Sequence, residues 1–349
     1  MATMAQAIRL ALHYGEEQLG VKEIFGEDVG PPLGGVFTCT QGLKTTWNSP
    51  LDERGIVGCA LGLAMAGQKP VAEVQFSDYI FNAIDLLKLC GNARWLSAGQ
   101  STAQMVIMTP VGAGIHGATY HSHSFESIMS HIQGWKIVMP SNAYDAYGLM
   151  ISAIKDPNPV MVLIPKALIR SQCEKKLPGE PQDPRELSKM IDAPIGDRTL
   201  WKPKWPKLEE IIMPLSKANL AREGEHITLI SYGRMFLCCL EAAKKIEEEG
   251  ISCEVIDLRT IYPYDEETIF KSVSKTGRVI VVNEDTEVTN FGEHLLRRIN
   301  DECFYSLESP PILLAGANVP GVGLSEPLEE VSIPSTKFIL DAIRDSLQS

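Results

Sequence analysis

Three of the chain's seven histidines lie close together in the stretch GAGIHGATYHSHSFES, residues 112–127. In an extended segment His121 and His123 point the same way, because side chains alternate with a period of two. Together with His116 they could bind a metal, transfer protons near neutral pH, or face solvent as ordinary loop residues. Apart from Glu126, no Cys or carboxylate stands nearby at a spacing typical of zinc sites, which favours a catalytic loop over a zinc site.

A carboxylate opens the stretch ERGIVGCALGLAMAG, residues 53–67, for which we predict a helix. Glu53 follows a proline segment, and the positive end of a helix favours a carboxylate there, so the alternative to a catalytic role is helix capping. Gly58, Gly62 and Ala66 recur every four residues, which predicts a helix face that packs tightly on another helix.

Gln75 and Tyr79 come at the end of the apolar run VAEVQF and on the turn that follows it. Open α/β sheets bind ligands at the carboxyl edge of their strands, so both are candidates for a binding pocket. They could equally be ordinary interface residues.

Asp156 and Asn158 lie on the turn KDPNP. Turns of this kind aim backbone carbonyls at one point and could hold a hard cation, although an ordinary turn explains the composition as well.

Apolar β-rich runs alternate with helical patterns, which predicts parallel sheets covered by helices on both faces. An amphipathic helix opens the chain, Ser141 is the expected N-cap of a helix that ends near Lys155, and Gly250 is the expected stop of another. The proline-rich segment 171–215 predicts an interdomain connection packed in part by its tryptophans. The expected strands are 71–76, 103–110, 135–140, 159–165, 226–233, 253–260, 278–285 and 311–316, and the expected helices are 77–94, 141–155, 234–250 and one from Thr336.

Composition limits the function classes. The 349 residues carry a net charge of −12, which disfavours a nucleic-acid partner. The eight cysteines form no C-x-x-C pair and are expected as free thiols. The weakly polar run 55–67 is too short to span a membrane, and the N-terminus lacks the features of a secretory signal or transit peptide, so we expect a cytoplasmic protein. P-loop, dinucleotide-binding and nucleophile-elbow patterns are missing from the sequence.

Nine stretches, taken in order, resemble the beta subunit of the thiamine-diphosphate-dependent decarboxylase component of 2-oxo acid dehydrogenase complexes. The resemblance covers nearly the whole chain except about 171–213. It implies a transketolase-like pyrimidine-binding domain with a parallel sheet flanked by helices (1–170), the extended linker (171–215) and a transketolase C-terminal α/β domain (216–349). The stretches are IFGEDVG, GGVFTCTQGL, NSPLDERGIVG, VAEVQFSDYIF, HGATYHSHSFES, WKIVMPSNAYDAYGL, KDPNPVMVLIPKALIR, CEVIDLRTIYP and KTGRVIVVNED.

The resemblance also implies roles for single residues. Glu53 would contact the aminopyrimidine nitrogen of thiamine diphosphate and so promote its activation. Tyr79 would pack on the pyrimidine, and Gln75 would line the same pocket. His121 would act in proton transfer and in reductive acylation of the lipoyl group, while His123 stands where the family usually has Gln.

Cations and partners follow from the same resemblance. The G-D-G…N motif that binds magnesium and diphosphate is missing here, so an alpha subunit would supply the Mg²⁺ site in an α2β2 heterotetramer, and this chain alone would be inactive. A lipoyl acyltransferase core would be the further partner. A monovalent cation, typified by K⁺, would bind to carbonyls at the positions that match the family's site: Ala103, Met105, Val106, Ala153, Asp156 and Asn158.

Two segments, GGVFTCTQGL and VAEVQFSDYIFNAIDLL, look more like branched-chain enzymes, which indicates a substrate such as 2-oxoisovalerate. Pyruvate and acetoin remain alternatives. From a different class, a non-catalytic scaffold subunit would be favoured if Glu53 or His121 were replaced, but both are present.

Overall fold

The computed structural model describes residues 1–187 and 204–348, which form two compact units. Residues 188–203, and with them Met190 and Trp201 of the predicted connection, lie outside the described residues. The first unit comprises residues 1–110, 131–164 and 168–215, and the second comprises 111–130, 165–167 and 216–349.

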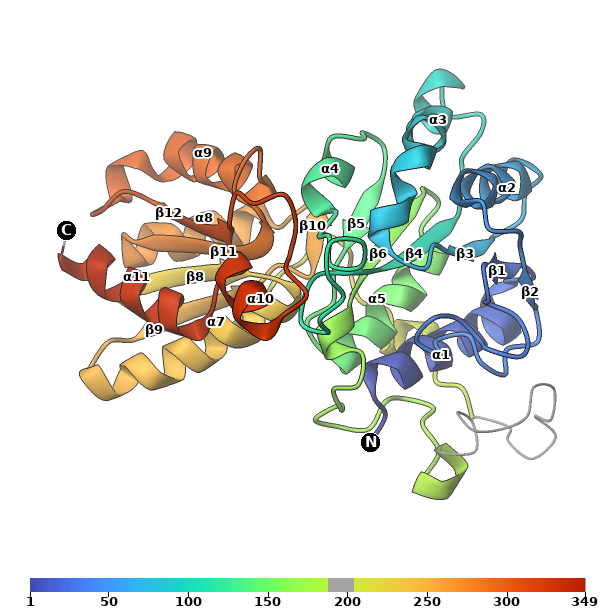
Figure 1. The fold of residues 1–349 in the computed structure, drawn as a ribbon, viewed down its shortest axis with the longest axis horizontal. Coiled ribbons are helices and arrows are strands. Elements are labelled where there is room, and N and C mark those ends of the chain that lie inside the picture. The colour runs from blue at the N-terminus through green and yellow to red at the C-terminus, as the bar shows by residue number, and fades with distance from the viewer. Residues whose placement is uncertain (188–203, 349) are drawn as a thin grey trace. The chain divides into compact units, whose positions relative to one another are not determined.

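The first unit is built on a parallel sheet, as the continuous apolar runs predict. Its strands follow the order β5-β6-β4-β3-β1-β2. Their bounds are β1 (Ile24–Gly26), β2 (Thr46–Asn48), β3 (Val71–Glu73), β4 (Val106–Val111), β5 (Lys136–Val138) and β6 (Val160–Pro165). Every residue of β4 and β6 is buried, because helices cover both faces (Figure 1). Those helices are α1 (Met4–Tyr14), α2 (Glu53–Met65), α3 (Ile84–Leu96) and α5 (Ala143–Lys155), with short turns at Gly15–Leu19, Ser77–Ala83, Lys166–Leu168 and Leu208–Glu210.

The predicted N-terminal helix is confirmed as α1, which is buried along its whole length and packs on α5. Two other local expectations for this unit are wrong. The N-cap of α5 is Asn142, whose side chain accepts from the Asp145 N–H, and not Ser141. The helix expected from residue 77 begins with a 3-10 segment, and α3 starts only at Ile84.

The described parts of 171–215 pack with the first unit. Cys173, Leu177 and Ile211 belong to its hydrophobic core. Trp205 makes an edge-on ring contact with Tyr14 at 5.4 Å and donates from Nε1 to Glu17 at 2.7 Å. These residues therefore stabilise the first unit, as the tryptophan argument predicts for Trp205.

The second unit is built on a sheet of strand order β12-β11-β8-β9-β7, parallel except for β7, which runs antiparallel to β9. Helices α7 and α11 cover one face and α8 and α9 the other (Figure 1). Gly250 ends the α7 region in a left-handed conformation with φ 79°, as predicted. The elements are α4 (Glu126–Ser130), β7 (Asn219–Arg222), β8 (Ile227–Ser231), α7 (Gly233–Ile246), a 3-10 turn (Glu247–Glu249), β9 (Cys253–Asp257), β10 (Thr260–Tyr262), α8 (Glu266–Thr276), β11 (Val279–Thr286), α9 (Phe291–Cys303), a 3-10 turn (Phe304–Ser306), β12 (Ile312–Gly316), α10 (Glu326–Ser332) and α11 (Thr336–Gln348).

The eight cysteines are free thiols, as expected. Within 1–187 and 204–348, no helix is both long and apolar enough to cross a membrane.

Candidate functional site

The carboxyl edge of the first unit's sheet gathers polar side chains from two neighbouring strands. Strands β1 and β3 run parallel with Gly26 opposite Glu73, so the residues that follow them meet at one edge. Gln75, just after β3, donates from Nε2 to the Glu27 carbonyl at 3.4 Å and to Asp28 Oδ2 at 3.3 Å. The predicted position of Gln75 at this edge is therefore confirmed, and its amide is held by the loop after β1.

Glu53 is the first residue of α2 and is half-buried. Its Oε2 accepts a hydrogen bond from Asn82 Nδ2 at 3.3 Å, which orients the carboxylate. Beside it, Arg54 and Asp85 form a two-pronged ion pair with Nη2–Oδ2 at 2.7 Å, which ties the start of α2 to the start of α3. The helix end and the side-chain contacts together fix where this acid stands.

Tyr79 lies in the same group of charges. Burial, then the charges of Asp78, Glu27 and Glu53, raise the pKa of Tyr79. Burial, then Asp28 and Glu53, raise the pKa of Glu27. The segment Ser77–Ala83, which holds Tyr79, packs on α2, and Asn82 of that segment donates to Glu53, so Glu53, Gln75 and Tyr79 lie near one edge of the sheet.

An aromatic surface adjoins the acids. The rings of Phe76 and Tyr79 meet edge-on at 5.6 Å, and those of Phe37 and Phe76 at 6.1 Å. Carboxylates beside aromatic rings suit a flat, nitrogen-containing heterocycle, since one wall can stack on it and the other can share a proton with it.

Sequence reasoning missed Glu27 and Asp28 as members of this group. They follow β1, a three-residue strand with too little pattern to recognise, so the sequence carried no clear signal that they belong to the edge where Gln75 is expected. Asp28 has a φ of 58°, a conformation that few non-glycine residues adopt, and it marks this loop as tightly constrained.

The histidine loop belongs to the second unit. His121 Nδ1 lies 3.0 Å from the Gly117 carbonyl. A carbonyl only accepts, so Nδ1 carries a hydrogen and Nε2 is the nitrogen that can take up or deliver a proton. This geometry suits proton transfer and turns one ring nitrogen away from metal binding.

Buried acids lie next to His123. Glu126 accepts from the Tyr232 hydroxyl at 3.2 Å, and Asp285 accepts from the Ser127 N–H at 3.3 Å. Burial and then the neighbouring Asp285 raise the pKa of Glu126 to about 8, and burial raises that of Asp285 although His123 opposes the shift. A cavity of about 210 Å³ opens here, lined by Ser122, His123, Ser124, Glu284, Asp285 and part of the loop after β12.

The sequence does not identify these acids as site residues, although Glu284 and Asp285 lie near the carboxyl-terminal end of β11. Across the two described ranges, no group of three or more His, Cys, Asp and Glu side chains could hold a metal ion.

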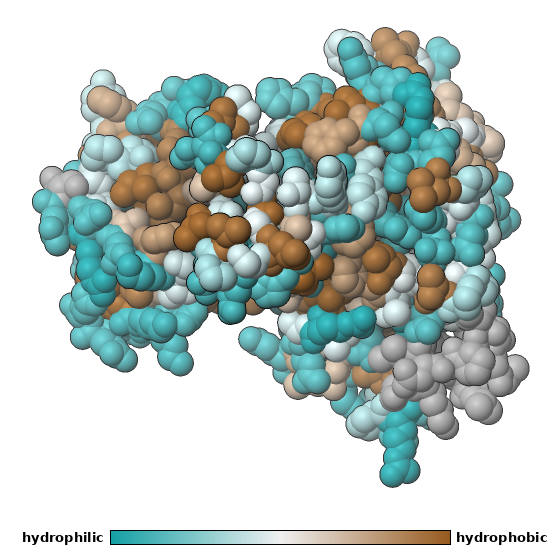
Figure 2. Space-filling model, viewed as in Figure 1, coloured by the Kyte–Doolittle hydropathy of each residue, from teal (hydrophilic) through white to brown (hydrophobic). Residues whose placement is uncertain are grey.

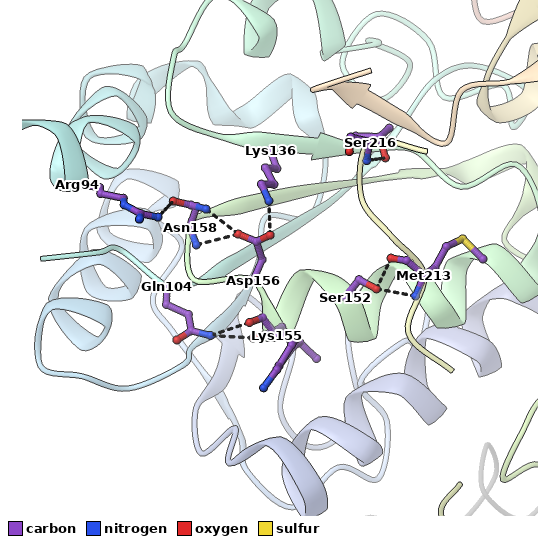
Figure 3. Close-up of polar contacts among 11 residues, drawn as sticks. Arg94, Gln104, Lys136, Ser152, Lys155, Asp156, Asn158, Met213 and Ser216 are labelled. Carbon is purple, nitrogen blue, oxygen red and sulfur yellow. Dashed lines mark hydrogen bonds and ion pairs between the residues drawn. The ribbon is translucent and has the colours of Figure 1, made fainter. Parts of the chain in front are cut away.

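The candidate cation turn is shown in Figure 3. Lys136 Nζ meets Asp156 Oδ2 at 2.5 Å, and Asp156 Oδ1 accepts from both nitrogens of Asn158 at 2.9 Å. Arg94 Nη1 donates to Asn158 Oδ1 at 3.2 Å. The side chains of this turn are thus bound to each other and to two cationic residues, so any further cation would have to use backbone oxygens.

Comparison with known proteins identifies the family. The model for "Transketolase, pyrimidine binding domain" matches residues 2–172, and that for "Transketolase, C-terminal domain" matches residues 216–339. Mitochondrial 2-oxoisovalerate dehydrogenase subunit beta 2 of Arabidopsis thaliana is 38% identical over 98% of this chain and 88% of its own length. The 2-oxoisovalerate dehydrogenase subunit beta of Bacillus subtilis (strain 168) is 34% identical over 97% of this chain and 96% of its own. The chain belongs to the 2-oxo acid dehydrogenase beta-subunit family.

Members with another named substrate are similar too. The pyruvate dehydrogenase E1 component subunit beta of Bacillus subtilis is 36% identical over 99% of this chain and 98% of its own. Among solved structures, a split-gene transketolase described as an inactive beta4 tetramer aligns with a TM-score of 0.72 at 19% identity, over 100% of this chain and 99% of that one. The predicted family and the predicted transketolase-like two-domain α/β fold are confirmed. Membership in the 2-oxo acid dehydrogenase beta-subunit family places the chain among thiamine-diphosphate-dependent oxidoreductases.

Proposed function

We propose that this chain is the beta subunit of a heterotetrameric 2-oxo acid dehydrogenase that decarboxylates branched-chain substrates such as 2-oxoisovalerate and acylates a lipoyl group. The observation that carries the proposal is the group of Glu53, Gln75 and Tyr79 at the carboxyl edge of β1 and β3. The named relatives favour 2-oxoisovalerate, and the similar pyruvate dehydrogenase subunit keeps pyruvate as the second candidate.

Thiamine diphosphate, when bound, supplies the electron sink for decarboxylation. On this chain Glu53 would hold a proton against the ring nitrogen of the cofactor's pyrimidine, with its carboxylate oriented by Asn82. Tyr79 would pack on the ring, and Gln75 would line the pocket. His121 would exchange a proton through Nε2 during acyl transfer to the lipoyl group.

The partner is proposed to be an alpha subunit that contributes the Mg²⁺ and diphosphate site of an α2β2 assembly. Exposed apolar side chains on α2 and α3 support a partner of this kind, since grouped exposed apolar side chains are typical of subunit contacts. Trp95 is 87% exposed, and its exposed apolar neighbours on these two helices are Met65, Leu89 and Leu96. Apolar patches also interrupt the hydrophilic surface in Figure 2.

Three finer points belong to the same proposal. A monovalent cation such as K⁺ would bind to main-chain oxygens among Ala103, Met105, Val106, Ala153, Asp156 and Asn158, because the acid of this turn is already paired with Lys136. A lipoyl acyltransferase core would be the second partner. A cytoplasmic location stays a prediction.

The test is co-expression of this chain with its genomic neighbour, followed by assays of 2-oxo acid decarboxylation with thiamine diphosphate and Mg²⁺. We expect kcat/KM for 2-oxoisovalerate to exceed that for pyruvate, and the chain purified alone to be inactive. Full turnover by the single chain would overturn the shared-site proposal. A preference for pyruvate would overturn only the proposed substrate assignment and would leave the rest of the proposal standing.

A further inference from the structure

The turn that precedes His121 has an unusual backbone. Gly112, Gly114, His116 and Ala118 have φ angles of 83°, 96°, 55° and 56°. Non-glycine residues are held in this left-handed region only when the surroundings fix them. A specific set of contacts must therefore hold this turn in place.

Glu329 of α10 provides two of those contacts. Its Oε1 accepts from the Gly114 N–H at 2.9 Å, and its Oε2 accepts from the His116 N–H at 3.1 Å. The His116 imidazole adds a third contact, with Nδ1 3.7 Å from Oε2. Only 5% of Glu329 is exposed, so water competes little for its oxygens.

Glu284 of β11 binds the backbone of Ala113, the residue before Gly114. Its Oε2 accepts from the Ala113 N–H at 3.1 Å. A methyl group on Gly112 would lie 2.4 Å from Glu284 Oε1, so this carboxylate sits directly against the backbone. Two acids from two elements of the second unit thus bind three backbone N–H groups of one turn.

The same turn orients His121. Gly117, directly after His116, offers the carbonyl that lies 3.0 Å from His121 Nδ1, and the His121 N–H donates to the Ala118 carbonyl at 3.3 Å. A change in the backbone at His116 therefore moves the atom that fixes the tautomer and direction of the His121 ring.

We propose that Glu329 is a positioning residue that fixes the 113–118 turn and thereby sets the His121 ring for acyl transfer to the lipoyl group. The acyl-transfer role of His121 rests on the proposed function. The positioning by Glu329 rests on the hydrogen bonds described above. Glu329 acts through the backbone and has no direct part in the chemistry.

The experiment compares Glu329→Ala and Glu329→Gln in the assembled complex with Glu330→Ala, an exposed neighbour on α10, and with His121→Ala. Three quantities are measured: 2-oxo acid decarboxylation with an artificial electron acceptor, acylation of a lipoyl domain by mass spectrometry, and hydrogen exchange of peptides that cover 112–121.

For Glu329→Ala we expect acylation to fall about 10-fold or more, as after misplacement of a reacting group. Decarboxylation should fall much less than acylation does, and hydrogen exchange in 113–118 should rise about 10-fold or more, because the lost hydrogen bonds favour local opening. His121→Ala is the reference for the acylation defect. Glu329→Gln keeps one acceptor oxygen and should recover part of the acylation rate.

The proposal would be overturned if Glu329→Ala acylated the lipoyl domain as fast as Glu330→Ala does. It would also be overturned if decarboxylation by Glu329→Ala fell as much as acylation, because that result indicates a general structural defect. If Glu329→Ala does not fold, Glu329→Gln decides, because unchanged acylation together with unchanged exchange would reject the positioning role. A wild-type complex that turns over no 2-oxo acid would instead reject the proposed function and the acyl-transfer role that depends on it. The exchange measurement would still decide whether Glu329 holds the turn.

Discussion

Glu53 stands where a helix end, an amide and two further acids meet. Asn82 donates a hydrogen bond to one oxygen of Glu53, and the charge of Glu53 contributes to the raised pKa values of Glu27 and Tyr79. The carboxylate of Glu53 therefore interacts electrostatically with its neighbouring acids and with any ligand that binds beside it.

Glu53→Gln removes the proton-accepting oxygen while it keeps the size of the side chain. In the assembled complex we expect kcat to fall by a factor on the order of 100 or more, the usual contribution of a positioned acid or base. Steady-state decarboxylation measures the effect, with Asp52→Asn as the matched control on the preceding residue. Equal activity of Glu53→Gln and wild type would remove Glu53 from its proposed role.

Glu73, at the end of β3, is a buried acid outside the proposed chemistry. Its Oε1 accepts from the Val36 N–H at 3.2 Å, and burial raises its pKa to about 7 although that hydrogen bond opposes the shift. The folded protein therefore binds this proton more tightly than the unfolded chain does. Its contribution to stability is fully present below about pH 4.5 and is lost as the pH rises through about 7.

Glu73→Gln should remove this pH dependence. Relative to wild type, the free energy of unfolding of the variant should rise between pH 4.5 and 8 by up to about 3 kcal/mol, from the size of the pKa shift. Urea unfolding followed by tryptophan fluorescence reports the first unit, because all five tryptophans precede residue 216. Glu248→Gln, at an exposed site, is the control, and a constant difference between Glu73→Gln and wild type across this range would contradict the assignment.

At the scale of helices and strands, elements inside clear apolar runs are predictable from sequence, including the short strands β3 and β5, whereas β1 and β2 are not. β6 is a continuous apolar run because both faces of its sheet are covered. β1 and β2 have three residues each and too little pattern to detect. The same limit explains the site: Gln75 follows a recognisable strand and was expected at the edge, whereas Glu27 and Asp28 follow β1 and were missed.

Helix α1 shows how a tertiary contact overrides a local pattern. Its polar positions suggest a water-facing side, yet Arg9 is fully buried and donates to the Thr38 carbonyl and to Gln41 Oε1. A charge can stay in the core when acceptors surround it. The loop that contains Thr38 thereby becomes part of the packing of the N-terminal helix.

Arg9→Ala leaves those acceptors buried and opens a cavity. We expect the free energy of unfolding of the first unit to fall by about 3 kcal/mol, from the unsatisfied buried acceptors and the cavity together. Arg9→Met, which keeps the volume, should cost less. Urea unfolding measures both, with the exposed Lys22→Ala as control. A loss no larger than that of Lys22→Ala would show that the buried guanidinium contributes little.

At the scale of the whole molecule, the small-residue face of α2 is only partly used by this chain. A methyl group on Gly58 would meet Leu86 at 3.3 Å, but one on Gly62 would meet nothing within 4 Å, and Ala66 is exposed. The expectation that all three pack tightly is therefore wrong for the chain by itself. Close-packing residues that face outward beside exposed apolar side chains are typical of a subunit contact.

Gly62→Gln tests that contact. Within the chain the side chain has room and glutamine favours a helix, so the melting temperature of the isolated chain should stay the same or rise slightly. Co-expressed with the alpha subunit, the variant should lose assembly, measured as a mass shift in size-exclusion chromatography with light scattering. Gln68→Glu, at a half-buried position just after α2, is the control. Normal assembly of Gly62→Gln would place the subunit contact elsewhere.

The histidine loop lies inside the segment that matches the pyrimidine-binding domain, yet residues 111–130 belong to the second compact unit, where Glu284 and Glu329 bind the backbone of the loop. The two domains are therefore not independent units for recombination between relatives, although they follow one another along the chain. A chimera joined near residue 172 would combine a loop from one parent with anchoring acids from the other. Exchange of parts should preserve function only when residues 111–130 travel with the C-terminal half.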